Sequence, residues 1–296
     1  MRSLSSLPIL LSAIMAVAAS TAQAGAIRDY FQSGESTVIH EGSYVPQLTP
    51  TTHILTNSIG CPRTYGGFDF AILQANVGGI SGSIAPLGIS GTVTPTFNLD
   101  IAPRIYFGRE RSDGLGLRLT YFHYDHTTGP SQLGVDTRLQ VQSLDVEATS
   151  RIQFHDSDLL LSAGFRYGKL MHNYQVTGLG SLGFDSEGGG LTIGGRYTRG
   201  IGHTCWDLFI GGRASILLTD NEIQIPGLIS IIGEESTMKV WEGQVGVGRT
   251  FDLYNRADLV TEVSFEAQNW DAAAIAGLVG NDISLFGPTF RIGLSF

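Results

Sequence analysis

The sequence predicts an all-β protein, a transmembrane up-and-down antiparallel β-barrel of about ten strands, within a range of roughly 8 to 12. Three observations lead to this fold class. The last segment alternates strictly between apolar and polar residues, and short and long connections alternate along the chain. Charged residues make up only 15% of the chain, while 42% is hydrophobic and 39 residues are glycine. A globule with so little charge would be poorly soluble, whereas a membrane barrel needs an apolar exterior.

The final stretch, Ser284–Phe296, reads SLFGPTFRIGLSF and has one apolar and one polar face. Its apolar parity contains Phe286, Pro288, Phe290, Ile292, Leu294 and Phe296. In a membrane barrel this face meets lipid and the other face meets the lumen. An alternating strand with a terminal phenylalanine resembles the C-terminal strand by which bacterial outer-membrane barrels are recognised for assembly. We therefore expect an assembly signal at Phe290, Ile292, Leu294 and Phe296.

The N-terminal residues predict a secretory signal peptide over residues 1–24. Arg2 precedes an apolar run from Leu7 to Ala19, and the small-residue site Ala22-Gln23-Ala24 follows. The run is shorter than the roughly 20 residues that a membrane-spanning helix requires. Residues 25–63 are rich in Thr, Ser and Pro and predict an irregular segment, which leaves residues 64–296 for the barrel. These features predict export to the bacterial outer membrane.

Ten strand-like runs follow one another after this segment. They are Tyr65–Asn76, Phe97–Gly108, Leu115–Asp125, Arg138–Phe154, Leu159–Gln175, Gly190–Thr198, Cys205–Leu218, Met238–Thr250, Ala257–Trp270 and Ser284–Phe296. Short polar turns close the even-numbered runs, and longer Gly-rich loops follow the odd-numbered ones, including Thr177–Gly189. Short periplasmic turns and long outer loops are typical of an up-and-down barrel, whereas a Greek-key sandwich has no reason to keep that order.

The fourth run predicts an irregularity. Leu144 and Val146 occupy one parity, but Leu139 and Val141 occupy the other. A single apolar face can accommodate both pairs only if one extra residue is inserted between them. We therefore expect a β-bulge near Gln142 and Ser143.

Charged residues fall on the polar parity of most runs, so they should line the lumen. The candidates are Arg104, Arg118, Asp145, Glu147, Arg166, Arg196, Asp207, Arg213, Glu242, Glu262, Glu266 and Arg291. Counting across the turns places Glu147 opposite Arg166 and Arg196 opposite Asp207. Such residues can form a constriction that selects solutes or ions, or they can fill a narrow interior with ion pairs. Both interpretations stay open, and we favour the second for a barrel of this size.

Several segments resemble a known family. LGLRLTYFHYDH at Leu115–His126, SLDVEATSRIQF at Ser143–Phe154, LSAGFRYGKL at Leu161–Leu170, FEAQNWDAAA at Phe265–Ala274 and LFGPTFRIGLSF at Leu285–Phe296 carry the resemblance. They are similar to the pore-forming outer-membrane barrels related to the Legionella major outer membrane protein, including members from planctomycete-type bacteria. The resemblance spans about Tyr65–Phe296 and implies a barrel that forms a pore.

Other chemistries find little support. A rim protease would need acids and a histidine to converge, and His123, Asp125, His126, Asp271 and Asp282 lie near outer ends. Neighbouring His and Asp are more often hydrogen-bonded rim residues, so we expect no catalytic residues. No CxxC or HExxH spacing occurs, so we expect neither metal nor cofactor. The net charge of −9 argues against nucleic acid.

The two cysteines, Cys61 and Cys205, lie beyond the signal peptide, where a disulfide can persist. Both should lie at the periplasmic end. A disulfide between them would require the N-terminal segment to cross the barrel mouth, because the two Cα atoms must approach within about 7 Å.

Three outer loops are unusually apolar: Gly78–Gly91, Ile223–Gly233 and Ala272–Gly280. Exposed apolar patches often mark contact surfaces, so these loops could bind lipid or another protein, extend the barrel as hairpins, or fold inward as a plug.

The sequence leaves two functions open. The first is a porin-like barrel with a narrow or gated channel for small solutes or ions. The alternative is an adhesin-like or structural surface barrel that acts through its outer loops. Outer-membrane lipid and the barrel-assembly machinery are the expected partners, and a homo-oligomer is left open.

Overall fold

A computed structural model describes residues 62–77, 96–129, 135–154, 156–176, 180–202, 204–224, 231–232, 235–253, 257–272 and 281–296. The expected signal peptide, nearly all of the expected irregular segment, and Cys61 lie outside these residues. The described residues belong to one compact unit, Ile54–Phe296. No helix in this part of the chain is long and apolar enough to cross a membrane.

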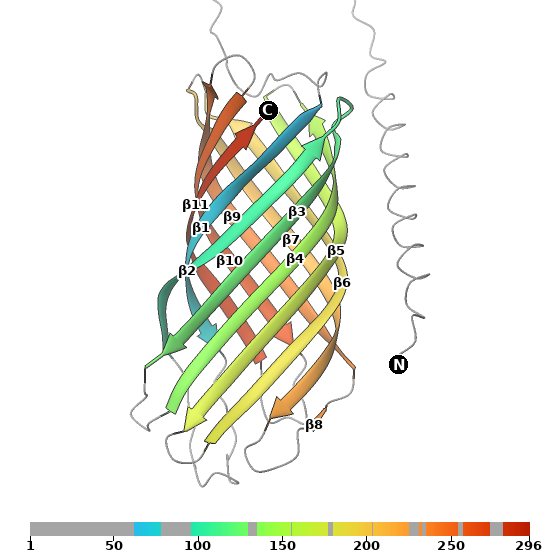
Figure 1. The fold of residues 1–296 in the computed structure, drawn as a ribbon. Helices are drawn as coiled ribbons and strands as arrows, with labels where there is room; N and C mark the ends of the chain where they lie inside the picture. Colours follow the sequence, from blue (N-terminus) through green and yellow to red (C-terminus); the bar gives the residue numbers. More distant parts are fainter. Residues whose placement is uncertain are drawn as a thin grey trace, which may run out of the picture. The chain divides into compact units, whose positions relative to one another are not determined.

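The described residues form a closed antiparallel β-barrel (Figure 1). Its strands are β1 (Arg63–Val77), β2 (Thr96–Glu110), β3 (Leu115–Thr128), β4 (Val135–Gln153), β5 (Ser157–Val176), β6 (Gly180–Gly200), β7 (Asp207–Gln224), β9 (Ser236–Leu253), β10 (Ala257–Ala272) and β11 (Asn281–Ser295). Each strand pairs with its neighbour in the chain, apart from the two-residue β8 (Ile231–Ile232), which pairs only with β7. Pairing of β1 with β11 closes the wall. The expected fold class and all ten expected strands are confirmed.

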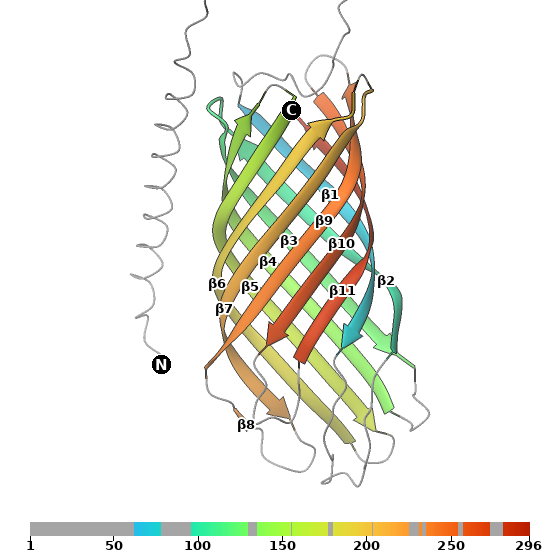
Figure 2. The ribbon, with the colours of Figure 1, turned by 180° about the vertical axis from the view of Figure 1, so that it is seen from behind.

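Both chain ends of the barrel lie at the same end as the short turns (Figure 2). The turn between β2 and β3 shows why these connections are short. The N–H of Gly114 donates to the carbonyl of Arg111, and Gly114 has φ of 82°, which glycine adopts without strain. The Ser-Asp-Gly sequence thus closes a tight turn. We call this the turn end and the opposite one the loop end.

The outer wall carries a belt of exposed apolar side chains. Members include Ile105, Phe107, Leu117, Leu119, Val146, Leu161, Ile193, Ile210, Trp241, Val245, Val263, Phe265 and Ile292. A membrane-spanning strand needs about 9 to 11 residues, whereas β5 and β6 have 20 and 21. The wall therefore continues past the lipid. On β5 the outward row changes from Tyr167 to Lys169, which binds Asp185 and Glu187 on β6. The extension beyond this level lies at the loop end.

The polarity of the two faces inverts in this extension. Leu139, Val141, Leu170, Leu217 and Met238 are fully buried inside the barrel, together with Trp270, Ile283 and Leu285. Outside at the same level lie polar residues such as Arg138 and Gln142. A wall that is surrounded by water is apolar inside for the same reason that a soluble barrel is. We call this set of buried side chains the apolar layer.

The inversion corrects two expectations. The expected bulge near Gln142 and Ser143 is absent, because β4 pairs with both neighbours in unbroken register. Leu139 and Val141 share the inward parity with Asp145; the interior itself changes from charged to apolar. The expected loop Thr177–Gly189 is also mostly strand, since β6 begins at Gly180. The sequence pattern did not identify this part of β6 as a strand because its outward residues, Asp185 and Glu187, are charged. They are charged because this part of β6 lies above the lipid.

Candidate functional site

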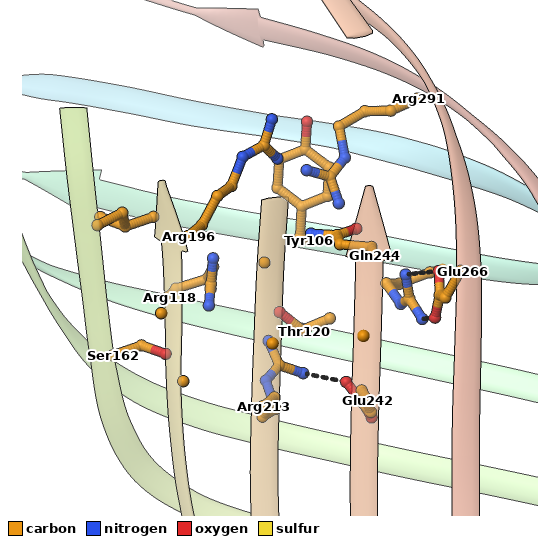
Figure 3. Close-up of a pocket in the computed structure, with 17 residues that line it drawn as sticks. Tyr106, Arg118, Thr120, Ser162, Arg196, Arg213, Glu242, Gln244, Glu266 and Arg291 are labelled. Atoms are coloured by element: carbon orange, nitrogen blue, oxygen red, sulfur yellow. Dashed lines mark hydrogen bonds and ion pairs between the residues drawn. The ribbon is translucent and has the colours of Figure 1, made fainter. Parts of the chain in front are cut away.

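All twelve lumen candidates lie on the inward face of the barrel, and several of them converge on a small cavity (Figure 3). Strand alternation places them there, because their neighbours on both sides in sequence belong to the outward rows. Eleven of the twelve, with Asp69 as a further member, form a charged network made of two ion-paired halves; the twelfth, Asp207, belongs to neither half. The network balances six arginines against six acids: Arg104, Arg118, Arg166, Arg196, Arg213 and Arg291 with Asp69, Asp145, Glu147, Glu242, Glu262 and Glu266.

One half of the network centres on Arg166, whose side chain is 1% exposed. Arg166 donates to both carboxylate oxygens of Asp145 at 2.5 and 2.9 Å and to Glu242 at 2.7 Å. Arg213 adds contacts to Asp145 at 3.0 Å and to Glu242 at 3.3 Å. The bidentate bond of Arg166 to Asp145 and the further charge-assisted contacts fix both guanidinium groups.

Glu147 links this half to the neighbouring strands. Its carboxylate accepts hydrogen bonds from Arg118 at 2.8 Å, Arg213 at 3.3 Å and the Ser162 hydroxyl at 3.0 Å. The side chain is fully buried, and three donors compensate for its lost hydration.

The other half of the network lies between β1, β2, β6, β10 and β11. Arg291 donates to both oxygens of Asp69 at 2.7 Å and to Glu262 at 3.2 Å. Arg104 binds Glu266 at 2.5 and 3.0 Å and also reaches Asp69 at 3.3 Å. Arg196 donates to Glu262 at 2.6 and 3.1 Å. Every acid in this half accepts from at least one arginine.

Aromatic rings support several of these arginines. The guanidinium of Arg196 lies 3.8 Å from the ring centre of Phe209, and that of Arg291 lies 4.9 Å from that of Tyr106. Arg104 lies over Phe122 at 5.1 Å. A cation over an aromatic face is attracted electrostatically, which further restricts the side chain.

Four arginines reach across the lumen to strands that are not their neighbours. The pairs are Arg166–Glu242 (β5 to β9), Arg104–Glu266 (β2 to β10), Arg196–Glu262 (β6 to β10) and Arg213–Asp145 (β7 to β4). In each pair two other strands separate the partners along the wall. The network therefore bridges the interior in several directions.

Both expected pairings are wrong. Arg166 lies opposite Asp145, and Glu147 lies opposite Gly164. Arg196 lies opposite Gly211, and Asp207 lies opposite Gly200. The count across each turn failed because the turns lie at other places in the sequence than the apolar pattern suggests. Gln153 pairs with Asp158 across the first turn, and Gly200 pairs with Asp207 across the second.

Asp69 was missed in the sequence analysis, although it is fully buried in the network. Its signal is present in the sequence, because it stands between Phe68 and Phe70 on β1, whose aromatic rings occupy the outward parity. A further group of ion pairs lies at the turn end. There Arg151 binds Glu110 at 3.1 Å, and Arg63 binds Asp258 at 2.7 Å.

Two small cavities lie within the described lumen. A cavity of about 90 Å³ is lined by Arg118, Arg196, Arg213 and Arg291, and one of about 190 Å³ lies nearer the turn end. Asp207 and Arg196 both line the larger one. Toward the loop end the apolar layer follows directly, because Gln268 joins Glu266 of the network to the indole N–H of Trp270. The described lumen thus contains a charged network and an apolar layer in series.

The outer-end acids and histidines do not converge. Asp125 faces outward, where its bonds from Arg138 lower the pKa of the carboxyl. His126 faces inward and binds Asp100. Asp271 and Asp282 are cross-strand neighbours on the outer face. No group of three or more metal-ligating side chains occurs in the described part of the chain.

The remaining sequence candidates are partly placed. Phe290, Ile292, Leu294 and Phe296 point outward and are exposed, and the backbone of Phe296 exchanges hydrogen bonds with Thr64 of β1. Cys205 is exposed in the turn between β6 and β7, but the disulfide stays a prediction because Cys61 lies outside the described residues.

No family model and no curated protein matches the chain. Among solved structures, the chain is similar to the outer membrane protease OmpT from Escherichia coli, with 11% identity, a TM-score of 0.47 and coverage of 79% of this chain and 96% of that one. The translocator domain of autotransporter NalP from Neisseria meningitidis has 12% identity, a TM-score of 0.42 and 99% coverage of both chains. Ail, the attachment invasion locus protein of Yersinia pestis, has 12% identity, a TM-score of 0.32 and coverage of 78% and 98%.

Proposed function

We propose that this outer-membrane β-barrel is a surface protein without an open through-channel, which corresponds to the alternative function of the sequence analysis. The single observation that carries the proposal is the series of two closures in the lumen. Cross-lumen ion pairs such as Arg166–Glu242 fill the first level, and fully buried side chains such as Leu139 and Trp270 fill the second.

A porin-like channel requires both levels to rearrange. Several ion pairs of the charged network would have to break. Each broken pair would leave buried charges without their partners, which is energetically costly. The apolar layer would have to separate so that water could replace its contacts. The cavities of about 90 and 190 Å³ have room for on the order of ten water molecules each and lie on the turn side of the apolar layer.

Single-channel recording in planar bilayers tests the proposal. We expect no steps, or only rare and brief ones, from the reconstituted wild-type protein. The matched variant Arg166→Ala removes one cross-lumen bridge but leaves the apolar layer intact, so it should stay silent as well. Large, stable steps from the wild-type protein would overturn the proposal and support the porin-like interpretation.

We also propose that the surface role belongs to the loop end and involves no catalysis. The three apolar loops named above begin or end at described strands, and the wall below them extends past the lipid. Replacing residues 273–280 with a Gly-Ser segment of equal length should lower the adherence of expressing cells to hydrocarbon and leave the heat-modifiable folded fraction unchanged. Unchanged adherence would count against this role. Cleavage of a peptide library by the purified barrel would contradict the absence of catalysis.

A further inference from the structure

The wall between β2 and β3 is paired along only part of its length. The ladder runs from Arg104 opposite Phe122 to Glu110 opposite Gly116, which is seven pairs, whereas β4 and β5 form 19. Beyond it, Thr96–Pro103 of β2 pairs only with β1, and His123–Thr128 of β3 pairs only with β4. The ladder therefore stops at the loop end of this seam, where β2 changes direction in Figures 1 and 2.

Pro103 explains where the ladder stops. If the register continued, Pro103 would lie opposite His123. Proline has no N–H to donate, so it is disfavoured inside a sheet that is paired on both sides. The same strand also shifts its register against β1 between Gln74 and Asn76. Both irregularities separate the first half of β2 from β3.

A side-chain contact replaces the missing backbone bonds. The continued register places Asp100 opposite His126, and Nδ1 of His126 lies 2.5 Å from Oδ2 of Asp100. Phe97 lies behind this pair, with its ring centre 5.7 Å from that of His126 and 6.5 Å from that of His172. Phe97 also belongs to the apolar layer, so the contact leads directly to the interior.

Buried polar groups without partners lie beside this route. Both ring nitrogens of His172 and the hydroxyls of Tyr124 and Tyr174 are buried and have no hydrogen-bond partner in the described structure. An unsatisfied buried polar group costs roughly 1 to 3 kcal/mol. Several of them together, next to the apolar layer, suit a ligand that has both a polar head and an apolar chain.

The unpaired part of the seam begins at the outer boundary of the lipid. On β3 the outward row changes from Tyr121 to His123 and Asp125, whereas Leu99 and Ile101 on β2 expose apolar side chains at 57% and 61%. Unpaired backbone cannot face the hydrocarbon core, but it is tolerated at the headgroup level, where water is available.

We propose that the unpaired part of the β2–β3 seam is a lateral gate. It admits a single-chain amphiphile, such as a fatty acid, from the outer leaflet into the apolar layer, with Asp100–His126 as its latch. The chain takes the place of the Phe97 ring, and the headgroup accepts or donates hydrogen bonds at His172, Tyr124 and Tyr174. This binding site goes beyond the proposed function, since a closed barrel with or without a ligand would be silent in bilayers.

Fluorescence quenching tests the gate, because Trp270 is fully buried in the apolar layer. The chain has three tryptophans, and Trp206 and Trp241 are exposed on the outer wall. The double variant Trp206→Phe/Trp241→Phe therefore leaves Trp270 as the reporter. Titration with 9,10-dibromostearate should quench its emission in a saturable manner. Absence of quenching would overturn the proposal.

A crosslink distinguishes the seam from other routes. In a background with Cys61→Ser and Cys205→Ser, Ile101→Cys/Asp125→Cys places thiols on opposite sides of the unpaired seam. Joining them with a short bismaleimide should suppress quenching, whereas blocking each with N-ethylmaleimide should not. The control pair Arg109→Cys/Leu117→Cys lies in the closed ladder, where the same crosslink should have no effect. Equal quenching with and without the seam crosslink would refute lateral entry.

A final variant tests the polar end of the site. His172→Leu fills the site with an apolar side chain but removes the two ring nitrogens. The affinity for dibromostearate should therefore fall about tenfold, as expected when a hydrogen bond to a charged group is lost. A brominated alkane without a headgroup should be unaffected by this change. Equal effects on both probes would contradict the assignment of the headgroup. Heat-modifiable migration would confirm that each variant is folded.

Discussion

The Nη1 atom of Arg166 lies 2.7 Å from the carboxylate of Glu242, although β6 and β7 separate their strands along the wall. This bond therefore crosses the lumen, and Asp145 holds the same guanidinium from the adjacent strand. The Arg166 side chain is only 1% exposed, so it does not line an open path. The relationship connects the stability of the barrel with its closure.

We expect Arg166→Ala to destabilise the barrel strongly, because it leaves Asp145 and Glu242 short of a buried partner. Removing one member of a buried ion pair costs about 3 to 5 kcal/mol. The control is Arg138→Ala, whose partner Asp125 lies on the outer face and whose own side chain is 49% exposed. That pair should contribute at most about 1 kcal/mol. Urea unfolding in lipid vesicles measures both, and equal losses would contradict the cross-lumen arrangement.

The inverted polarity of β4 predicts opposite effects at adjacent residues. Leu139→Lys places a charge in the apolar layer and should cost roughly 3 kcal/mol or more, as an unpaired buried charge does. Gln140→Lys lies on the outward face above the lipid and should change stability by less than about 0.5 kcal/mol. With a bulge at Gln142, Leu139 would face outward and Gln140 inward, and the two effects would be exchanged. Comparison of the unfolding midpoints of the two variants therefore decides between a regular and a bulged β4.

His172 makes the stability of the loop end depend on pH. Burial lowers its pKa to about 4, and its ring contacts Phe97 and the titratable Tyr174. The unfolded state, with a pKa near 6.5, binds the proton first, so stability is full above about pH 6.5 and falls as the pH drops toward 4. The loss should reach about 3 kcal/mol at the lower limit. His172→Leu should flatten the unfolding free energy over this window; an unchanged pH profile would show that another group is responsible.

Phe296→Asp should lower assembly in the outer membrane, because this residue ends the exposed row of β11 and its backbone bonds to Thr64 complete the closing seam. The measurement is the heat-modifiable fraction in outer-membrane preparations. Phe154→Asp is the control, since Phe154 is similarly exposed at the turn end but does not lie on β11. Comparable losses from both variants would show that the effect is a general one of charge on the wall.

The sequence by itself determined the barrel, its ten strands and the inward position of the charged candidates. These properties follow from the two-residue period of a strand, which is local and survives in any register. The same period also predicts the inward position of Asp69, because Asp69 lies between two outward phenylalanines. The order of short and long connections likewise needs no tertiary contact to be recognised.

The tertiary structure alone decided which charges meet and where the interior changes character. Arg166 pairs with Asp145 and Glu242 rather than Glu147 because register depends on the geometry of each turn, and cross-lumen contacts depend on closure of the whole wall. The inward position of Leu139 and the unpaired seam at Pro103 are invisible to a rule that assigns every apolar residue to lipid. Above the lipid, water surrounds the wall, and the side of the strand that must be apolar is then the inside.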